Sequence, residues 1–295
     1  MATATAVRFR LEAALVRGVA AVVRVLPVPT VRAAGAALGR FVFLLDGFHR
    51  RLALTNIARA LPAKPVEERR LVIRRVFEHF GSVLLELIKI GTLTETEILE
   101  RVECEGEERV WQAHAKGRGV LLFTGHFGYW EVHAIALALR IRPIAVMARP
   151  LDNPRLHAML ERIRTRTGNS VIYRQGAIRK VLRELAANRG VAILIDQHLH
   201  TDAVHVDFFS RPAATTSALA ALALRTGAPV IPAFALPLPN GRYRLVYEHA
   251  VEPPASDSPD AVREFTQRCT DVLEMYIRRH PDLWLWMHRR WRSDG

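Results

Sequence analysis

The sequence predicts an α/β fold, in which a mostly parallel or mixed sheet is flanked by helices. Short apolar runs recur between residues 120 and 234, and stretches whose apolar residues have helical spacing separate them. Strands that alternate with helices in this way form a sheet whose faces the helices cover. The runs expected to form buried strands are 120–123, 144–147, 170–173, 191–195 and 230–234.

The helices and a further strand follow from the same alternation. Asn240-Gly241 is a turn of the kind that joins antiparallel strands, so we expect a last strand at 243–247 to run antiparallel to its predecessor. The stretches expected to form connecting helices are 132–139, 154–167, 177–188 and 216–226.

The first sixty residues differ in composition from the rest, because they carry nine arginines against one glutamate and one aspartate. Arg17 and Arg24 interrupt the apolar stretch 11–26, and together with Arg10 they recur at seven-residue intervals and share one face of the expected helix. Sixteen helical residues reach about 24 Å, short of a hydrocarbon core of about 30 Å. We expect a helix in the lipid headgroup layer. An ordinary amphipathic helix and a signal peptide are the alternatives, and no small-x-small cleavage site follows.

Prolines divide this first segment from the rest of the chain. A helical pattern over 31–60 is broken at 61–65, where Pro62 and Pro65 stand, and another helix is expected over 66–90. No internal repeat or low-complexity linker interrupts the remainder. We therefore expect a helical, membrane-associating segment over 1–60 and a single catalytic domain over 61–295.

The net charge of +13 and the pI near 10.8 indicate an anionic partner. Nucleic acid, an acidic lipid surface and phosphorylated substrates all meet that description. The chain has only two cysteines, Cys104 and Cys269, which argues against a disulfide framework and for a reducing compartment.

His126 and Glu131 are the clearest candidates for chemistry, in the segment TGHFGYWE directly after the first expected strand. On one helix a five-residue step would turn the two side chains about 140° apart. Gly125 and Gly128 permit a tight turn, so we expect Glu131 to face the imidazole, fix its tautomer and raise its basicity. No Gly-x-Ser-x-Gly elbow is present, and neither cysteine is near a histidine. The pair suits general-base activation of a substrate hydroxyl.

Other polar residues stand at expected strand ends or helix starts. Arg149 could bind phosphate or carboxylate, and Asp152 or Asn153 is expected to cap the next helix. Asp196 ends a strand, where a general base, a substrate ligand and a loop cap are all open. Histidines alternate over 198–207, but a turn is more natural there than a metal site, so we expect no metal.

Two further segments leave alternatives open. Thr215 or Thr216 can cap the helix over 216–226, and backbone amides there could hold phosphate or an oxyanion. Residues 284–291 gather three tryptophans beside cations. Membrane-interface anchoring and core packing with cation–π contacts are both consistent with this composition.

Together these segments resemble the bacterial lipid A biosynthesis lauroyl/myristoyl acyltransferases, the late acyltransferases that add secondary acyl chains and are similar to lysophospholipid acyltransferases. The resemblance spans essentially the whole chain in the family's order. The segments that carry it are GHFGYWE at 125–131, RPLDNP at 149–154, DQ at 196–197, FFSRPA at 208–213, RTGAPV at 225–230 and WLWMHRR at 284–290.

The resemblance implies a membrane enzyme on the cytoplasmic face of the cell inner membrane. It implies acyl transfer from acyl carrier protein or acyl-CoA to a hydroxyl of a lipid acceptor, without a cofactor or a metal. His126 would be the general base, and Glu131 would orient it and stabilise the imidazolium. The residues that would bind substrate are Arg149, Arg164, Asp196 and Arg211.

The acceptor is expected to be a lipid A precursor, with another lipid such as mannosylated phosphatidylinositol as the alternative. The chain has His200, Thr201 and Asp202 where family members often have glycines, and Ser210 in place of a common glycine. A lipid or thioester hydrolase is the rival enzyme, since water could replace the acceptor. A nucleic-acid-binding protein would use the charge but leave the His/Glu pair unexplained. A non-catalytic membrane scaffold would be indifferent to His126→Ala.

Overall fold

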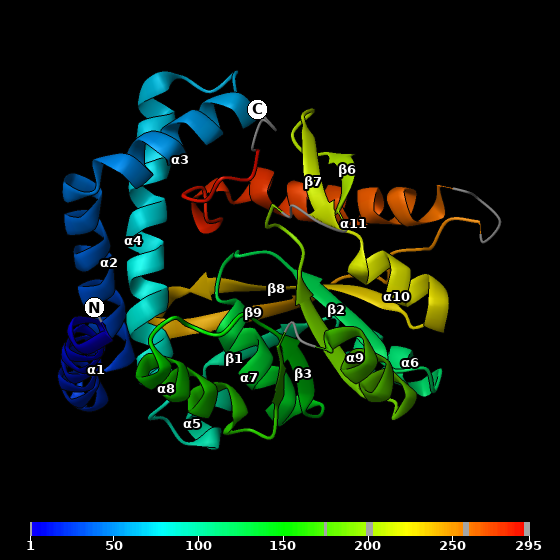
Figure 1. Ribbon diagram of the computed structural model, residues 1–295, viewed down its shortest axis with the longest axis horizontal. Coiled ribbons are helices and arrows are strands. Elements are labelled where there is room, and N and C mark those ends of the chain that lie inside the picture. The colour runs from blue at the N-terminus through cyan, green and yellow to red at the C-terminus, as the bar shows by residue number, and fades with distance from the viewer. Residues whose placement is uncertain (1, 174–175, 199–202, 256–259, 292–295) are drawn as a thin grey trace.

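The computed structural model describes residues 2–173, 176–198, 203–255 and 260–291. It has the α/β fold that the sequence predicts, with a seven-stranded sheet in the order β1-β9-β8-β2-β5-β3-β4 and helices on both faces (Figure 1). The strands of this sheet are β1 Val102–Glu105, β2 Val120–Thr124, β3 Ile144–Met147, β4 Ser170–Ile172, β5 Gly190–Leu194, β8 Val230–Leu238 and β9 Arg242–Tyr247.

The sheet is parallel except at one pair. β8 and β9 run antiparallel, which confirms the expectation from the Asn240-Gly241 turn. All five expected buried runs form strands, whereas the four-residue strand β1 was not expected. β5 lies directly beside β2 and parallel to it, with Thr124 opposite Leu194. The chain segments that follow these two strands therefore meet at one edge of the sheet.

Side chains of β2 alternate between two hydrophobic cores, one on each face of the sheet. Leu121 and Phe123 belong to the first core, and Val120 and Leu122 to the second. This alternation is the period-two pattern of a strand that is buried on both faces. The helices that cover the faces are α5 Glu95–Leu99, α6 Glu107–Ala115, α7 Trp130–Arg140, α8 Pro154–Thr165, α9 Ala177–Ala186, α10 Ala218–Thr226 and α11 Ala261–Arg279, with 3-10 turns η1 Pro239–Gly241 and η2 Pro281–Leu283.

Four long helices form the N-terminal part, at the left of Figure 1. They are α1 Ala2–Val25, α2 Val28–Leu45, α3 Gly47–Ala60 and α4 Val66–Ile90. α1 begins earlier than expected, and Arg10, Arg17 and Arg24 are exposed on it. The helix expected over 31–60 is divided at Asp46, whose side chain accepts a hydrogen bond from the backbone N–H of His49.

α2 lies tightly along α4. A Cβ atom at Gly39 would stand only 1.9 Å from the carbonyl oxygen of Phe77, and one at Gly81 only 2.2 Å from that of Gly35. Only glycine fits such a close approach of two helix backbones. Of the described helices, α2 is also the one whose length and apolar composition would let it cross a membrane. Phe41, Leu44 and Leu45 near its end are exposed.

A two-stranded hairpin, β6 Ala203–Asp207 and β7 Pro212–Thr216, stands apart from the main sheet and packs against α11 (Figure 1). At its turn, Phe209 and Ser210 both have positive φ, near +56° and +55°. Glycine is preferred in that conformation, so Phe209 and Ser210 occupy backbone positions that ordinarily favour glycine. The hairpin was not expected. The helix predicted over 216–226 begins at Ala218, whose N–H donates to Thr216 Oγ1.

Candidate active site

His126 lies in the turn between β2 and α7, at the carboxyl edge of the sheet. Gly128 makes this turn possible, because its φ is +57° and an added Cβ would stand 2.0 Å from the carbonyl oxygen of Ala235. The Gly128 N–H donates to the carbonyl of Leu283 at 2.9 Å. The expected tight turn is therefore present, and it leaves no room for a side chain at position 128.

Asp196, not Glu131, is the partner of the imidazole. His126 Nδ1 lies 2.9 Å from Asp196 Oδ1, and the His126 backbone N–H donates to Asp196 Oδ2 at 2.8 Å. Asp196 follows β5, the immediate neighbour of β2, so the two residues meet at the sheet edge. The expected contact between Glu131 and the imidazole is therefore corrected: the carboxylate that can fix the tautomer comes from the next strand.

The Asp196 carboxylate is fully buried and fully hydrogen-bonded. The side chain of Asp196 is 0% exposed, and the indole Nε1–H of Trp284 donates to Asp196 Oδ2 at 2.8 Å. Burial would raise the pKa of Asp196, but the charge of His126 and the hydrogen bonds hold this pKa well below its usual range. Burial would lower the pKa of His126, yet the Asp196 carboxylate beside it raises that pKa above its ordinary value.

Glu131 is held instead by Arg164, on α8. Arg164 Nε donates to Glu131 Oε2 at 2.9 Å, and its Nη2 contacts Oε1 of the same carboxylate. Both side chains are mostly buried. Burial would lower the pKa of Arg164, and the Glu131 carboxylate raises it. The ion pair adjoins the dyad, because Trp130, next to Glu131 in sequence, packs edge-on against the His126 ring at 5.4 Å.

The segment 284–291 forms a wall behind His126. Trp284 pairs with Phe127 in an antiparallel bridge, and the Leu285 N–H donates to the carbonyl of His126 at 3.0 Å. Asn56 of α3 donates to the carbonyls of Trp286 and His288 and so ties this wall to the N-terminal helices.

Core packing, rather than membrane anchoring, describes this wall. Trp284 and Trp286 are fully buried. Arg290 is buried too, 5.1 Å above the ring of Phe208, and its guanidinium donates to the carbonyl of Ala214 at 2.7 Å. The cation–π alternative from the sequence is confirmed for these residues.

A second buried carboxylate, Glu86 of α4, lies close to the same turn. Arg32 of α2 donates to both of its oxygens, at 2.7 and 2.9 Å. The hydroxyls of Tyr129 and Tyr243 donate to it as well. The Arg32 guanidinium lies 5.3 Å from each of the two tyrosine rings. Tyr129 follows Gly128, so this cluster holds the end of the same turn.

Two predicted substrate ligands lie on the surface, outside this arrangement. Arg149 pairs with Asp152 at 2.7 Å, and both side chains are about four-fifths exposed. Asn153, not Asp152, caps α8, because its side chain accepts from the N–H of Arg155. Arg211 is exposed at the hairpin turn and contacts the carbonyl of Arg59. A substrate role for either arginine stays a prediction.

Neither metal nor thiol chemistry has a visible site in the part of the chain that the structure describes. No group of three His, Cys, Asp or Glu side chains is placed there to hold a metal ion. His200 and Asp202 of the alternating histidine stretch lie outside the described residues. Burial raises the pKa of Cys104 to about 11 and that of Cys269 to about 12, so both thiols stay protonated at neutral pH.

The arrangement suits proton abstraction from a hydroxyl. Asp196 occupies Nδ1, and no described residue is hydrogen-bonded to Nε2 of His126, whose side chain is 17% exposed. A neutral ring held by a carboxylate at one nitrogen presents the other as a base. Trp284, Asn56 and Glu86 support this geometry but were not predicted. Only the tryptophan-rich composition of 284–291 signalled part of it.

Comparison with known proteins yields one consistent family. The model of the family described as bacterial lipid A biosynthesis acyltransferase matches residues 4–293. The lipid A biosynthesis lauroyltransferase of Escherichia coli (strain K12) is 26% identical over 271 residues, which are 91% of this chain and 87% of the relative. The phosphatidylinositol mannoside acyltransferase of Mycolicibacterium smegmatis is 25% identical over 243 residues, 81% of this chain and 78% of the relative. Across nearly its whole length, therefore, this chain belongs to the bacterial lipid A biosynthesis acyltransferases, and it is an acyltransferase.

Proposed function

We propose that this enzyme moves a fatty acyl chain from the thioester of acyl carrier protein or coenzyme A to a hydroxyl of a lipid acceptor, with His126 as the general base. The observation that carries the proposal is the buried contact between His126 Nδ1 and Asp196 at the carboxyl edge of the sheet. This contact occupies Nδ1 and leaves Nε2 of His126 as the atom that can take a proton.

In the proposed reaction, His126 Nε2 takes the proton of the acceptor hydroxyl while its oxygen attacks the thioester carbonyl carbon. The tetrahedral intermediate then collapses, the C–S bond breaks, and the imidazolium returns its proton to the departing sulfur. Asp196 stabilises the imidazolium between these two steps. The thioester supplies its own electrophile, so the proposal includes neither a cofactor nor a covalent enzyme intermediate.

Arg164 and Glu131 would act beside this dyad rather than within it. Their ion pair is mostly buried and lies next to Trp130, which contacts the His126 ring. We expect it to fix the first turn of α7 beside the His126 ring. Arg149 and Arg211, which are exposed, are the cations available to an anionic lipid headgroup.

A lipid A precursor is the proposed acceptor, because the family description and several relatives name lipid A. A phosphatidylinositol mannoside is the alternative acceptor, since relatives of similar identity carry that name. A hydrolase is the alternative activity. Consumption of the thioester that requires the acceptor distinguishes transfer from hydrolysis.

We place the enzyme on the cytoplasmic face of the cell inner membrane, where it binds anionic lipid. Arg10, Arg17 and Arg24 are exposed on α1, and Phe41 and Leu44 are exposed on α2. Exposed cations and exposed apolar side chains on the N-terminal helices suit the interface of a bilayer. Replacing the three arginines by glutamate should release the protein from anionic vesicles, and unchanged sedimentation with vesicles would contradict the placement.

The test of the reaction measures transfer of a labelled acyl chain from acyl carrier protein and from coenzyme A to a panel of lipid acceptors. Wild type is compared with His126→Ala of matched circular dichroism, and with Arg70→Ala, at an exposed position of α4, as a surface control. We expect transfer to a lipid A precursor that His126→Ala abolishes. Transfer to another lipid alone would change the acceptor, and activity retained by His126→Ala would reject the base.

A further inference from the structure

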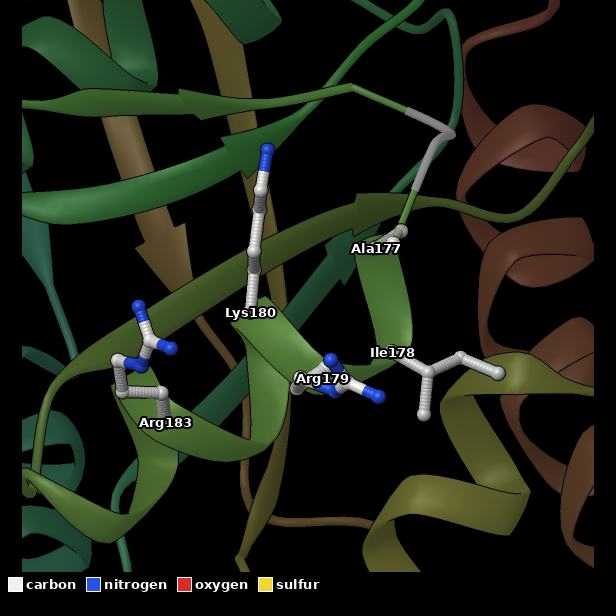
Figure 2. Close-up of a pocket in the computed structure, with 6 residues that line it drawn as sticks. Ala177, Ile178, Arg179, Lys180 and Arg183 are labelled. Atoms are coloured by element: carbon white, nitrogen blue, oxygen red, sulfur yellow. The ribbon is translucent and has the colours of Figure 1, made fainter.

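Helix α9 presents a cluster of cations that neither the fold nor the proposed chemistry uses. Arg179, Lys180 and Arg183 are exposed on this helix, next to Ile178, which is 62% exposed. Together they line an open depression of about 520 Å³, and Figure 2 shows the three cationic side chains extending outward from the helix. We call these four residues the α9 face.

The α9 face has no partner within the described chain. The acid on α9 does not serve these cations, because Glu184 pairs with Arg189 at 2.5 Å. No ion pair is found between the three cations of the α9 face and any described residue. Like charges four residues apart, as at Arg179 and Arg183, destabilise a helix by a few tenths of a kcal/mol. The cluster therefore does nothing for stability, and an acidic partner would account for it.

The position of α9 favours a donor that docks beside the active site. α9 follows β4, so its first turn lies at the carboxyl edge of the sheet, where β2 presents His126. In the sheet, β4 and β2 are separated by β5 and β3, which is three strand spacings or about 14 Å. A thioester at the end of a flexible pantetheine arm can span such a distance, whereas a donor bound rigidly on α9 cannot.

The chemistry of the α9 face favours a protein over a nucleotide or a membrane. Its cations are all exposed, and none is buried to grip a phosphate with fixed geometry. Exposed charges around one apolar side chain are typical of a polar, electrostatically steered protein contact. The exposed apolar side chains of the N-terminal helices lie elsewhere, since Figure 1 shows α1 and α2 at the left and α9 to the right of centre.

We propose that the α9 face is the docking site for an acidic acyl carrier protein, whose acyl-loaded arm reaches along the sheet edge to His126. This inference rests on the proposed function and selects the carrier protein over coenzyme A as the donor. The cations attract the acidic surface of the carrier, and Ile178 packs against an apolar side chain at the centre of the contact.

The experiment compares two donors that share a thioester but differ in the protein. The double variant Arg179→Glu/Arg183→Glu should raise the KM for acyl carrier protein by at least about tenfold, while kcat/KM with acyl-pantetheine changes less than about twofold. The matched control is Lys116→Glu/Arg225→Glu, which makes the same change in net charge at exposed positions near the amino ends of β2 and β8. We expect the control to match wild type with both donors.

Direct binding separates this inference from the reaction itself. Fluorescence anisotropy of a labelled, pantetheine-bearing carrier protein needs no turnover, and binding should weaken in the α9 double variant but not in the control. Unchanged binding and KM would overturn docking on α9 while leaving the chemistry intact. Transfer from acyl-CoA alone would overturn it as well. A loss of vesicle binding, with equal loss of activity for both donors, would instead assign the α9 face to the membrane.

Discussion

Two buried carboxylates flank the turn that carries His126, and they differ in what holds them. The side chains of Glu86 and Asp196 are both 0% exposed. Glu86 is neutralised by Arg32 and bound by two tyrosine hydroxyls. Asp196 accepts from the His126 ring, the His126 backbone and the Trp284 indole.

The difference lies in whether the cation can give up its proton. An arginine stays protonated in proteins, so the Glu86 cluster has a fixed charge state. A histidine titrates near neutral pH, so the Asp196 cluster can exchange a proton with a substrate. Tyr129 and His126 stand three residues apart in one turn. We infer that the first cluster holds the turn in place and the second performs the chemistry.

The largest expected effect is that of Asp196→Asn on turnover. The asparagine oxygen can still accept from Trp284 and from the His126 backbone, but its amide would then donate to Nδ1. This moves the ring proton to Nε2 and removes the base, so kcat should fall by about a thousandfold or more. The unfolding free energy should fall as well, because the lowered pKa of Asp196 means that its carboxylate stabilises the folded state. A steady-state assay with a parallel urea titration checks both, and near-normal kcat would remove Asp196 from the mechanism.

Glu86→Gln should lower stability but leave turnover nearly unchanged. Removing one charge of a buried pair leaves Arg32 uncompensated, which should lower the unfolding free energy by about 3 kcal/mol. Turnover per folded molecule should change less than about threefold, because no proton of the reaction passes through this cluster. Urea unfolding and active-site-normalised kcat are the measurements. A large loss of kcat with an unchanged unfolding free energy would contradict the inference that the Glu86 cluster only holds the turn in place.

Trp284→Phe tests the support of Asp196 with a smaller change. The phenyl ring keeps most of the packing but cannot donate to Oδ2, so the carboxylate charge acts more strongly on His126. We expect kcat to fall by about tenfold, on the scale of one charge-assisted hydrogen bond. The pKa of His126, followed by NMR of its ring protons, should rise. Trp286→Phe is the matched control, since the Trp286 indole donates to the carbonyl of Pro281 instead.

The smallest expected effect is a dependence on pH that runs in opposite directions for activity and for stability. The pKa of His126 is raised in the folded state, mainly by Asp196 acting against burial. The base is lost below that pKa, so kcat should fall by about tenfold per pH unit on the acid side. The contribution of the His126–Asp196 pair to the unfolding free energy changes with pH in the opposite direction. It is complete below the unfolded pKa of about 6.5 and is lost as pH rises through the folded value.

The measurement takes the difference in unfolding free energy between wild type and His126→Gln at several pH values above 6.5. This difference should shrink with rising pH while the activity of wild type grows. A difference that grows together with activity would contradict the raised pKa.

Most of the sheet could be predicted, because its central strands are buried on both faces. Continuous apolar runs such as Val120–Thr124 and Val230–Leu238 have few other places in a fold. β1 reads VECE and alternates too briefly to mark a strand. The β6–β7 hairpin turns on Phe209 and Ser210 at positive φ without the glycine that would signal it.

Sequence identified His126 and Asp196 but not their pairing, and it did not identify Trp284, Asn56 or Glu86, which support them. Sequence placed His126 and Asp196 at the ends of two strands, yet only the strand order puts β5 beside β2. Glu131 is near His126 in sequence, which made it the natural candidate, whereas Arg164 arrives from another helix. Local spacing predicts turns and caps, but contacts between distant strands depend on topology.

The wall behind His126 also sets when the site can form during synthesis. Residues 284–291 leave the ribosome long after the strands that carry His126 and Asp196. Until they do, Asp196 Oδ2 lacks the indole N–H of Trp284, and Asn56 has no carbonyls to bind. A nascent chain therefore carries His126 and Asp196 without this support until residues 284–291 are made, and stop codons shortly before residue 284 should give inactive protein.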